Sequence, residues 1–444
     1  MTDANKKIKV LVIMPQVDYS DRAAVNFCKG MNRNIFEIKA LAYYGEVGGK
    51  EKDFADMGVE LVLANGNLEV VAGAIKKWQP DVIHIHRSGH YVPIELDIFR
   101  MAKSINPSMV ILETSVFGKY DKKSLPLIDC SLQISKMMLN ERYVKAVGYF
   151  DFDRTKVVYN PVDCQGWDKM GITDDEVEAF KNKLGIKEND FVIGKSGRPH
   201  IAKWSDLLLD MMPYLVKLAP NTKFIVQEMP SSRKKRVLRS KYKDRYILLD
   251  QTFDDRRVAL FYKTIDVYVH ASKIGESFGM TLAEAGIFKK PVVVNSTPNR
   301  DNNQLDLIEH MKTGIIANYP QTFARAIEYL YKNKDIRIKM GEAARAKIAA
   351  TYNPGRIAEQ LEKIIVEKLV KNKQYIDPQV AEHYGKIDYY PSQEEILAFK
   401  DEYKKLLKQE FGKLSVLERC VNYLNRPRKF YYKARDFIEH RVGI

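Results

Sequence analysis

Two glutamates eight positions apart, Glu276 and Glu284, stand in the stretch HASKIGESFGMTLAEAGIF. The pattern predicts a strand end, a loop over residues 275–279, and a helix that begins at Met280 or Thr281. Eight positions are slightly more than two helical turns, so both carboxylates can face one cleft if Glu276 lies in the loop just before the helix. A carboxylate accepts hydrogen bonds from vicinal hydroxyls such as those of ribose. The spacing therefore favours a ligand that carries such hydroxyls.

Two cations upstream could bind phosphates of the same ligand. Arg198 and Lys203 lie in the stretch SGRPHIAKWSDLLLD. An arginine holds phosphate oxygens with a bidentate fork, and a lysine holds them with a point charge. The backbone N–H groups of residues 278–281 would form a helix N-terminus, a further site for phosphate oxygens. Arg198 or Glu284 taken singly is typical of an exposed surface charge. Together and in this order, the residues indicate a phosphorylated ligand that carries hydroxyls.

The segments that would position these residues alternate between strands and helices. Strands are predicted by the apolar runs KVLVIMP, FEIKALAYYG, VELVLA, DVIHIH and MVILETS, and helices by LEVVAGAIKKW and PIELDIFRMAK. Such alternation predicts a parallel sheet covered on both faces by helices. A second series of strands, FVIGKSG, TKFIVQE, RYILLD, DVYVHAS and PVVVNS, follows VVYNPVD at residues 157–163. The sequence therefore predicts two α/β halves with a boundary near Cys164.

Helical patterns dominate the C-terminal part of the chain. Asn353 as N-cap and Pro354 at the first helical position predict an amphipathic helix over residues 353–373. The residues that follow are rich in tyrosine and lysine, and Ser392 with Glu395 fits a capping box. They predict an appended helical region.

These motifs resemble those of the retaining family-4 glycosyltransferases, the glycosyl transferases group 1, which have the GT-B fold. Glu276 and Glu284 match the family's E-x7-E motif, and Gly197, Arg198 and Lys203 match its G-R-x(4)-K-G segment, with Trp204 in place of the last glycine. VVYNPVD is similar to the family's hinge between domains. The resemblance covers most of residues 1 to 370 and is most specific over residues 194–318.

The resemblance implies two Rossmann-like domains that face a central cleft. Residues 1–163 would form the acceptor domain, residues 164–352 the donor-binding domain, and residues 353–373 a helix that crosses back to the first domain. Residues 374–444 lie outside the resemblance and are predicted to form a helical, basic extension.

The resemblance also implies roles for single residues. Arg198 and Lys203 would bind the donor's pyrophosphate, Glu284 its ribose, and Glu276 would lie beside the transferred sugar. Glu276, Arg198 and Lys203 are therefore the predicted catalytic residues. The predicted donor-binding residues are Gly197, Arg198, Lys203, Glu276, Ser277, Phe278, Gly279, Met280, Thr281 and Glu284. The segment from Pro298 to Glu309 stands where the family has a glycine-containing loop, and this chain has NRDNNQLDLIEH there instead.

Three histidines in the first half lie in HIHRSGHY. Alternation along a strand puts His84 and His86 on one face, which resembles metal-ligand spacing, but the sequence shows no fourth ligand. Hydrogen-bonded histidines at the end of a strand are the favoured interpretation. His86, Arg87 and His90 are the predicted acceptor-side residues, and no metal site is predicted.

The predicted reaction moves a sugar from a nucleoside-diphosphate sugar to a hydroxyl acceptor with retention at the anomeric carbon. The nucleotide sugar is a co-substrate, and no cofactor is expected. An Asp-x-Asp motif is not evident, which favours metal-independent catalysis. The acceptor is expected to be a lipid-linked or surface glycan. A catalytically silent GT-B-like protein that binds sugar nucleotides or glycans is the alternative.

The formal charge of +15 favours an anionic partner. The densest basic run, SSRKKRVLRSKYKDR at residues 231–245, fits either a solvated face or contact with an anionic membrane surface. No apolar run approaches the ~20 residues that span a bilayer, and the four separated cysteines fit a reducing compartment. We therefore expect a cytoplasmic protein, with peripheral association with the inner face of the membrane left open. No nucleic-acid motif is evident, so nucleic acid is not an expected partner.

Overall fold

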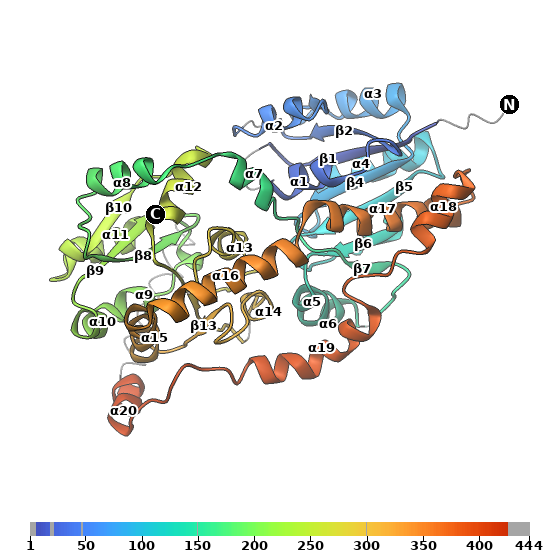
Figure 1. Ribbon diagram of the computed structural model, residues 1–444. Helices are drawn as coiled ribbons and strands as arrows, with labels where there is room; N and C mark the ends of the chain where they lie inside the picture. The colour runs from blue at the N-terminus through green and yellow to red at the C-terminus, as the bar shows by residue number, and fades with distance from the viewer. Residues whose placement is uncertain (1–5, 18–21, 46–47, 149, 299, 425–444) are drawn as a thin grey trace. The chain divides into compact units, whose positions relative to one another are not determined.

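The structure, a computed structural model, describes residues 6–17, 22–45, 48–148, 150–298 and 300–424. Its contacts divide the chain into two compact units, each described here by itself (Figure 1). The first unit comprises Met1–Lys169, Ser277–Met280 and Lys347–Lys404. The second comprises Met170–Glu276, Thr281–Ala346 and Lys405–Ile444.

The first unit is built on a sheet of seven parallel strands in the order β3-β2-β1-β4-β5-β6-β7. Its strands are β1 (Ile8–Met14), β2 (Phe36–Ala42), β3 (Glu60–Leu63), β4 (Val82–Arg87), β5 (Val110–Ser115), β6 (Cys130–Gln133) and β7 (Thr155–Val157). Its helices are α1 (Arg22–Gly30), α2 (Glu51–Asp56), α3 (Leu68–Trp78), α4 (Pro93–Ile105), α5 (Lys136–Met138), α6 (Val144–Val147), α7 (Cys164–Lys169), α17 (Pro354–Lys371), α18 (Pro378–Gly385) and α19 (Gln393–Leu406), which runs into the second unit.

Helices cover both faces of this first sheet, as the continuous apolar strands require. Ile75 of α3 and Phe99 of α4 pack with Ile83 and Ile85 of β4 in one core cluster. The opposite face of β4 meets α1, whose Phe27 ring lies 5.5 Å from the ring of His84. The central strands are therefore buried on both sides.

The second unit is built on six parallel strands in the order β10-β9-β8-β11-β12-β13. Its strands are β8 (Phe191–Ser196), β9 (Thr222–Gln227), β10 (Tyr246–Leu249), β11 (Val267–His270), β12 (Val292–Val294) and β13 (Gly314–Ile316). Its helices are α8 (Asp174–Lys183), α9 (Leu207–Asp210), α10 (Met212–Leu218), α11 (Ser231–Leu238), α12 (Asp255–Thr264), α13 (Met280–Ile287), α14 (Gln304–Leu307), α15 (Pro320–Lys332), α16 (Lys334–Thr351) and α20 (Val416–Leu424). Met280 of α13 and the last residues of α16 belong to the first unit.

The core of the second unit contains Trp204, which is 2% exposed. It packs with Leu208 of α9, Phe224 of β9 and Phe323 of α15, among others. The indole that replaces the family's glycine is therefore a core side chain. It fills space between the sheet and the helices on one of its faces.

The C-terminal extension is part of both units. Helix α18 and most of α19 belong to the first unit, and residues 405–424 pack on the second. In the second unit the Glu410 carboxylate accepts hydrogen bonds from the backbone N–H of Asn318 at 3.0 Å and the hydroxyl of Thr322 at 2.6 Å, at the start of α15. Arg325 on α15 forms an ion pair of 2.7 Å with Glu418. The tail beyond residue 424, which is included in the predicted extension, lies outside the described residues.

The α/β prediction and both helix caps in the C-terminal part are confirmed. Asn353 accepts hydrogen bonds from the backbone N–H groups of Gly355 and Arg356, and α17 starts at Pro354. Ser392 and Glu395 exchange the two hydrogen bonds of a capping box. The predicted boundary at Cys164 stays a prediction, and in the structure the first compact unit extends to Lys169.

Candidate functional site

The predicted site forms where β8 and β11 end side by side. These strands are parallel neighbours in the second sheet, so the loops that follow them leave the same edge. Two hydrogen bonds join the loops: Ser205 N–H donates to the Ala271 carbonyl at 2.9 Å, and Lys273 N–H donates to the Ala202 carbonyl at 3.0 Å. This backbone pairing brings Lys203 next to the loop that carries Glu276.

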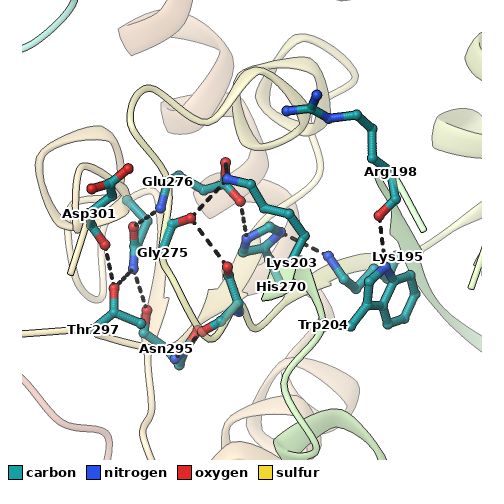
Figure 2. A network of polar contacts seen from close by, with 12 residues as sticks. Lys195, Arg198, Lys203, Trp204, His270, Gly275, Glu276, Asn295, Thr297 and Asp301 are labelled. Atoms are coloured by element: carbon teal, nitrogen blue, oxygen red, sulfur yellow. Dashed lines mark hydrogen bonds and ion pairs between the residues drawn. The ribbon is translucent and has the colours of Figure 1, made fainter. Parts of the chain in front are cut away.

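Lys203 and Glu276 form an ion pair, as Figure 2 shows. The Lys203 ammonium lies 2.9 Å from Oε2 of Glu276 and also donates to the Gly275 carbonyl at 3.0 Å. Burial alone would raise the pKa of Glu276, but the Lys203 charge and the contact with His270 outweigh it and lower that pKa to about 2. The structure therefore brings these two sequence-predicted residues together, with Glu276 ionised at neutral pH.

Gly275 allows the Glu276 loop to lie against a second loop. Its φ is +71°, and a Cβ atom there would lie 1.5 Å from the Asp301 carbonyl oxygen. The Glu276 N–H donates to Oε1 of Gln304 at 3.1 Å, and the Asn303 N–H donates to the Glu276 carbonyl at 3.0 Å. The described part of the segment from Pro298 to Glu309, where the sequence departs from the family, thus holds the backbone of Glu276 in place.

Arg198 stands apart from this ion pair in Figure 2. Its side chain is exposed. Its carbonyl oxygen accepts a hydrogen bond from Nε1 of Trp204 at 3.2 Å, which anchors the backbone that follows Gly197. Among the described residues, no group pairs with its guanidinium, so that cation is available to an anionic ligand. Its predicted contact with a pyrophosphate stays a prediction.

Glu284 lies on α13 and is 4% exposed. Its Oε2 accepts a hydrogen bond from the Tyr262 hydroxyl at 2.9 Å. Burial raises the pKa of Tyr268, and the negative charges of Glu284 and Glu276 raise it further. Both glutamates are therefore within electrostatic reach of one hydroxyl. A ribose contact by Glu284 stays a prediction that needs its buried carboxylate to be uncovered.

Helix α13 begins at Met280, which confirms the predicted helix start. Ser277 and Phe278 before it are buried, and the Phe278 ring lies 5.3 Å from that of Tyr352. Gly279 has a φ of +104°. Contacts of this loop, Met280 and Thr281 with a donor stay predictions.

Two buried residues that the sequence did not identify as site residues complete the cluster. Lys195, at the end of β8, places its ammonium 3.1 Å from Nδ1 of His270, at the end of β11. The other ring nitrogen of His270, Nε2, lies 3.0 Å from Oε1 of Glu276. The signals for them were a lysine inside an otherwise apolar strand and a histidine six positions before Glu276. Neither signal is specific by itself.

His84 and His86 share one face of β4, as predicted from alternation. Their ring centroids are 4.5 Å apart, and each lies 5.5 Å from the Phe27 ring of α1. Burial lowers the pKa of His86 to about 4. Within the described ranges, no group of three or more His, Cys, Asp or Glu residues could hold a metal ion. These histidines therefore lie, uncharged at neutral pH, between the sheet and α1.

Arg87 is enclosed, and His90 is exposed. The Arg87 guanidinium contacts Glu95 at 2.5 Å and Glu113 at 2.9 Å, and it donates to the His90 carbonyl at 2.5 Å. The His90 ring nitrogen Nε2 lies 2.8 Å from the Lys119 ammonium. Arg87 thus supports the loop that carries His90. Acceptor contacts by His86, Arg87 and His90 stay predictions, and for Arg87 they would require its buried cluster to open.

Comparison with known proteins shows similarity to glycosyltransferases. Residues 176–347 match the family described as glycosyl transferases group 1. The chain is 22% identical over 340 residues to the putative glycosyltransferase YtcC of Bacillus subtilis (strain 168). The aligned region covers 71% of this chain and 80% of that protein. It is 25% identical over 288 residues to alpha-monoglucosyldiacylglycerol synthase of Acholeplasma laidlawii, with coverage of 59% and 69%. The resemblance to the glycosyl transferases group 1 is confirmed over residues 176–347, and the matches support glycosyltransferase activity.

Solved structures show the same fold. Anabaena HepE, crystallised with UDP and glucose, superposes with a TM-score of 0.64 at 16% identity, over 81% of this chain and all of that chain. The glycosyltransferase WaaG gives a TM-score of 0.56 at 14% identity, over 80% of this chain and 99% of that chain. The predicted GT-B class, with two Rossmann-like domains and a helical C-terminal region, is confirmed.

Proposed function

We propose that this chain, whose residues 176–347 match the group 1 glycosyltransferases, moves a sugar from a nucleoside-diphosphate sugar to a hydroxyl of a lipid-linked or surface glycan. Retention at the anomeric carbon and independence of metal are part of the proposal. The observation that carries it is the Lys203–Glu276 ion pair at the carboxyl edge of the second sheet, where parallel α/β sheets bind ligands.

The charges of the site suit a departing nucleoside diphosphate. When the bond from the anomeric carbon to the β-phosphate oxygen breaks, negative charge grows on that phosphate. Lys203 and the free guanidinium of Arg198 supply fixed positive charge for it, aided by the N–H groups at the start of α13. In the proposed step the acceptor oxygen bonds to the anomeric carbon from the same face. Its proton passes to the departing phosphate, so no side-chain base is needed.

Glu276 and Glu284 are the proposed contacts for hydroxyl groups. Glu276 offers a carboxylate that is held from two sides and ionised at neutral pH. We place it beside the transferred sugar, whose hydroxyls donate to carboxylates. Glu284, eight positions later and about one turn into α13, is the proposed ribose contact. This step requires the sugar nucleotide to displace the Tyr262 hydroxyl from at least one carboxylate oxygen.

The names of similar proteins support the ligand classes. HepE structures contain UDP with glucose and UDP-glucose. Alpha-monoglucosyldiacylglycerol synthase is named for a glycolipid product. We therefore propose a uridine-type sugar nucleotide as the first donor to test, and an acceptor at or near a lipid surface.

A basic surface on α11 and the residues after it fits an anionic membrane. Its exposed side chains are those of Lys234, Lys235, Leu238, Arg239, Lys241 and Lys243. Arg236 is instead paired with Asp206 and Asp210, so it belongs to the fold. Among the described residues, no helix is long and apolar enough to span a bilayer. Peripheral contact through the exposed cations, on a cytoplasmic membrane face, is the proposed mode of association.

The function is tested by release of nucleoside diphosphate from UDP-glucose and related donors, with and without candidate lipid acceptors. Arg198→Ala and Lys203→Ala should each lower turnover about 10²-fold or more, as loss of a donor to a developing oxyanion does. Lys217→Ala, which removes an exposed lysine of α10, is the matched control and should be fully active. Product anomer analysis tests retention, and EDTA tests metal independence.

The outcomes separate the two candidate functions. Turnover that depends on Arg198 and Lys203 supports the enzyme. Tight nucleotide binding without turnover for any donor would favour a catalytically silent binding protein. Full activity in both variants would refute the assignment of the site.

A further inference from the structure

A linear chain of four charged or titratable side chains runs through the site. Its contacts are Lys195 Nζ to His270 Nδ1 at 3.1 Å, His270 Nε2 to Glu276 Oε1 at 3.0 Å, and Glu276 Oε2 to Lys203 Nζ at 2.9 Å. Figure 2 shows the chain together with the Trp204 ring. Lys203 and Glu276 have roles in the proposed reaction, whereas Lys195 and His270 have none so far.

The proton positions on His270 follow from the two groups that flank it, Glu276 and Lys195. Glu276 is a carboxylate that can only accept, so a proton on Nε2, the His270 nitrogen that lies 3.0 Å from it, is the favourable arrangement, although this contact does not have the angle of a good hydrogen bond. Burial, with the Lys195 charge, lowers the pKa of His270 to about 4, so the ring is neutral at pH 7. Nδ1 therefore has a lone pair, which the Lys195 ammonium meets as a donor.

Burial of the Lys195 ammonium group has a free-energy cost. Lys195 is 1% exposed in a strand whose other buried residues are apolar or glycine. A methionine would occupy similar space without the cost of burying an ammonium group. Among the described residues, Nδ1 of His270 is its one hydrogen-bond partner. The specific consequence of having a lysine here is therefore the state of His270.

Lys195 also touches the segment that carries Arg198. Its ammonium lies 4.7 Å from the centre of the Trp204 ring, and the Trp204 indole donates to the Arg198 carbonyl. A cation over an indole face is attracted by the ring quadrupole. One side chain thus contacts the supports of both the Arg198 backbone and the Glu276 carboxylate.

We propose that Lys195 is a positioning residue of the donor site that fixes the tautomer of His270 and, through it, the orientation of Glu276. This inference rests on the proposed function. With the Nε2–H of His270 facing one oxygen at 3.0 Å and Lys203 donating to the other, the carboxylate is held in one rotamer beside the sugar. The Lys195 ammonium further adds a positive charge behind a site that binds an anionic donor.

The pH dependence of the reaction should report this role. Burial lowers the pKa of Lys195 to about 7, the Glu276 charge opposes that shift, and the Lys203 charge adds to it. The groups that face Lys195 are His270 from β11, Glu276 from the following loop, and Lys203 with Trp204 from the loop after β8. As pH rises from about 6 to about 8 the ammonium loses its proton, so kcat/KM for the donor should fall over that range.

The first experiment compares Lys195→Met with wild type in donor turnover from pH 6 to 9. The variant should lose about tenfold or more of kcat at pH 6, and the fall of kcat/KM between about pH 6 and 8 should disappear. Lys290→Met is the control, because Lys290 is a half-buried lysine of the second unit whose pKa burial lowers, to about 8. It should keep both the rate and the profile. A Lys195→Met enzyme with the wild-type rate and profile would overturn the proposal.

Two His270 variants test the tautomer separately from the charge. In His270→Gln the amide NH₂ can donate to Glu276 while its oxygen accepts from Lys195, so this variant should keep more activity than His270→Leu. Equal activities would count against the proposal.

A measurement without turnover distinguishes failure of this inference from failure of the proposed function. Nitrogen NMR of ¹⁵N-histidine-labelled protein, with the His270 signals assigned by the Gln variant, gives the tautomer and the pKa of that ring. Wild type should show the Nε2–H form down to about pH 4, and Lys195→Met should raise this pKa because a nearby positive charge has gone. An unchanged His270 pKa refutes the inference even if the enzyme is active. A wild-type protein that shows the expected tautomer but turns over no donor refutes only the function.

Discussion

Lys203→Met is expected to destabilise the second unit by an amount that depends on pH. Both side chains of the Lys203–Glu276 pair are less than a fifth exposed, at 18% and 14%. Among the effects that oppose burial, the Lys203 charge is the largest, and together they lower the pKa of Glu276 from 4.5 to about 2. At roughly 1.4 kcal/mol per pKa unit, a shift of this size corresponds to about 3 kcal/mol of unfolding free energy at neutral pH.

The sign of the pH dependence follows from the direction of this shift. A carboxyl group whose folded pKa is depressed contributes stability that is complete above its unfolded pKa and is lost as pH falls toward its folded pKa. For Glu276 that window runs from about pH 4.5 down to about pH 2. Burial and His270 still act on this pKa in the variant, so the difference in unfolding free energy between wild type and the variant should be on the order of 1–3 kcal/mol at pH 7 and smaller at pH 3.5.

Urea unfolding followed by the fluorescence of Trp204 measures this difference in the core of the second unit. The other two tryptophans, Trp78 and Trp167, are replaced by phenylalanine in every variant. Lys332→Met is the control. It removes an ion pair between Lys332 and Glu328, and because the lysine side chain is 62% exposed, this loss should lower the unfolding free energy by less than about 1 kcal/mol. A Lys203→Met variant that is as stable as wild type at pH 7 would refute the reasoning. A difference in unfolding free energy of the same size at both pH values would refute it as well.

Two further predictions concern the loop and the basic surface. Gly275→Ala should abolish turnover and lower the midpoint of thermal unfolding, because residue 275 has a positive φ and a Cβ atom there would overlap the Asp301 carbonyl oxygen. A variant that is fully active and melts at the wild-type temperature would contradict this geometry. Replacing Lys234, Lys235 and Arg239 with serine should weaken co-sedimentation with vesicles that contain anionic lipid by about tenfold at low salt and leave donor hydrolysis in solution unchanged; undiminished vesicle binding would exclude this surface as the membrane contact.

Local patterns predicted the long elements and the centre of the site. Strands such as β1 and β8 are continuous apolar runs, and α17 has both a capping asparagine and a first-position proline. The family resemblance placed Lys203 and Glu276 in one site, but their ion pair was not predicted, because they lie 73 positions apart in loops that follow two different strands. Strands β7, β12 and β13 have three residues each, too few for a period of two to show, and β7 and β13 were not predicted.

The supporting residues could not be predicted, because their partners are brought by the fold. Lys195 is 75 positions from His270, and Arg87 is 26 positions from Glu113. In the sequence Lys195 is an ordinary charged residue near the end of a strand, and Arg87 was predicted as an acceptor-side residue and not as a buried support. Their burial, and so their role in holding other side chains, appears only when neighbouring strands are placed side by side.

The division of the C-terminal extension has a consequence for dissecting this protein. Residues 347–404 complete the first unit and residues 405–424 complete the second, while the second unit begins at Met170. A single cut therefore cannot yield two whole halves. A fragment stopped near residue 373 would strip Glu410 from the start of α15 and leave the Asn318 N–H and the Thr322 hydroxyl without that acceptor. A stable fragment of the second half therefore has to carry residues 405–424 as well, or have them supplied as a separate peptide.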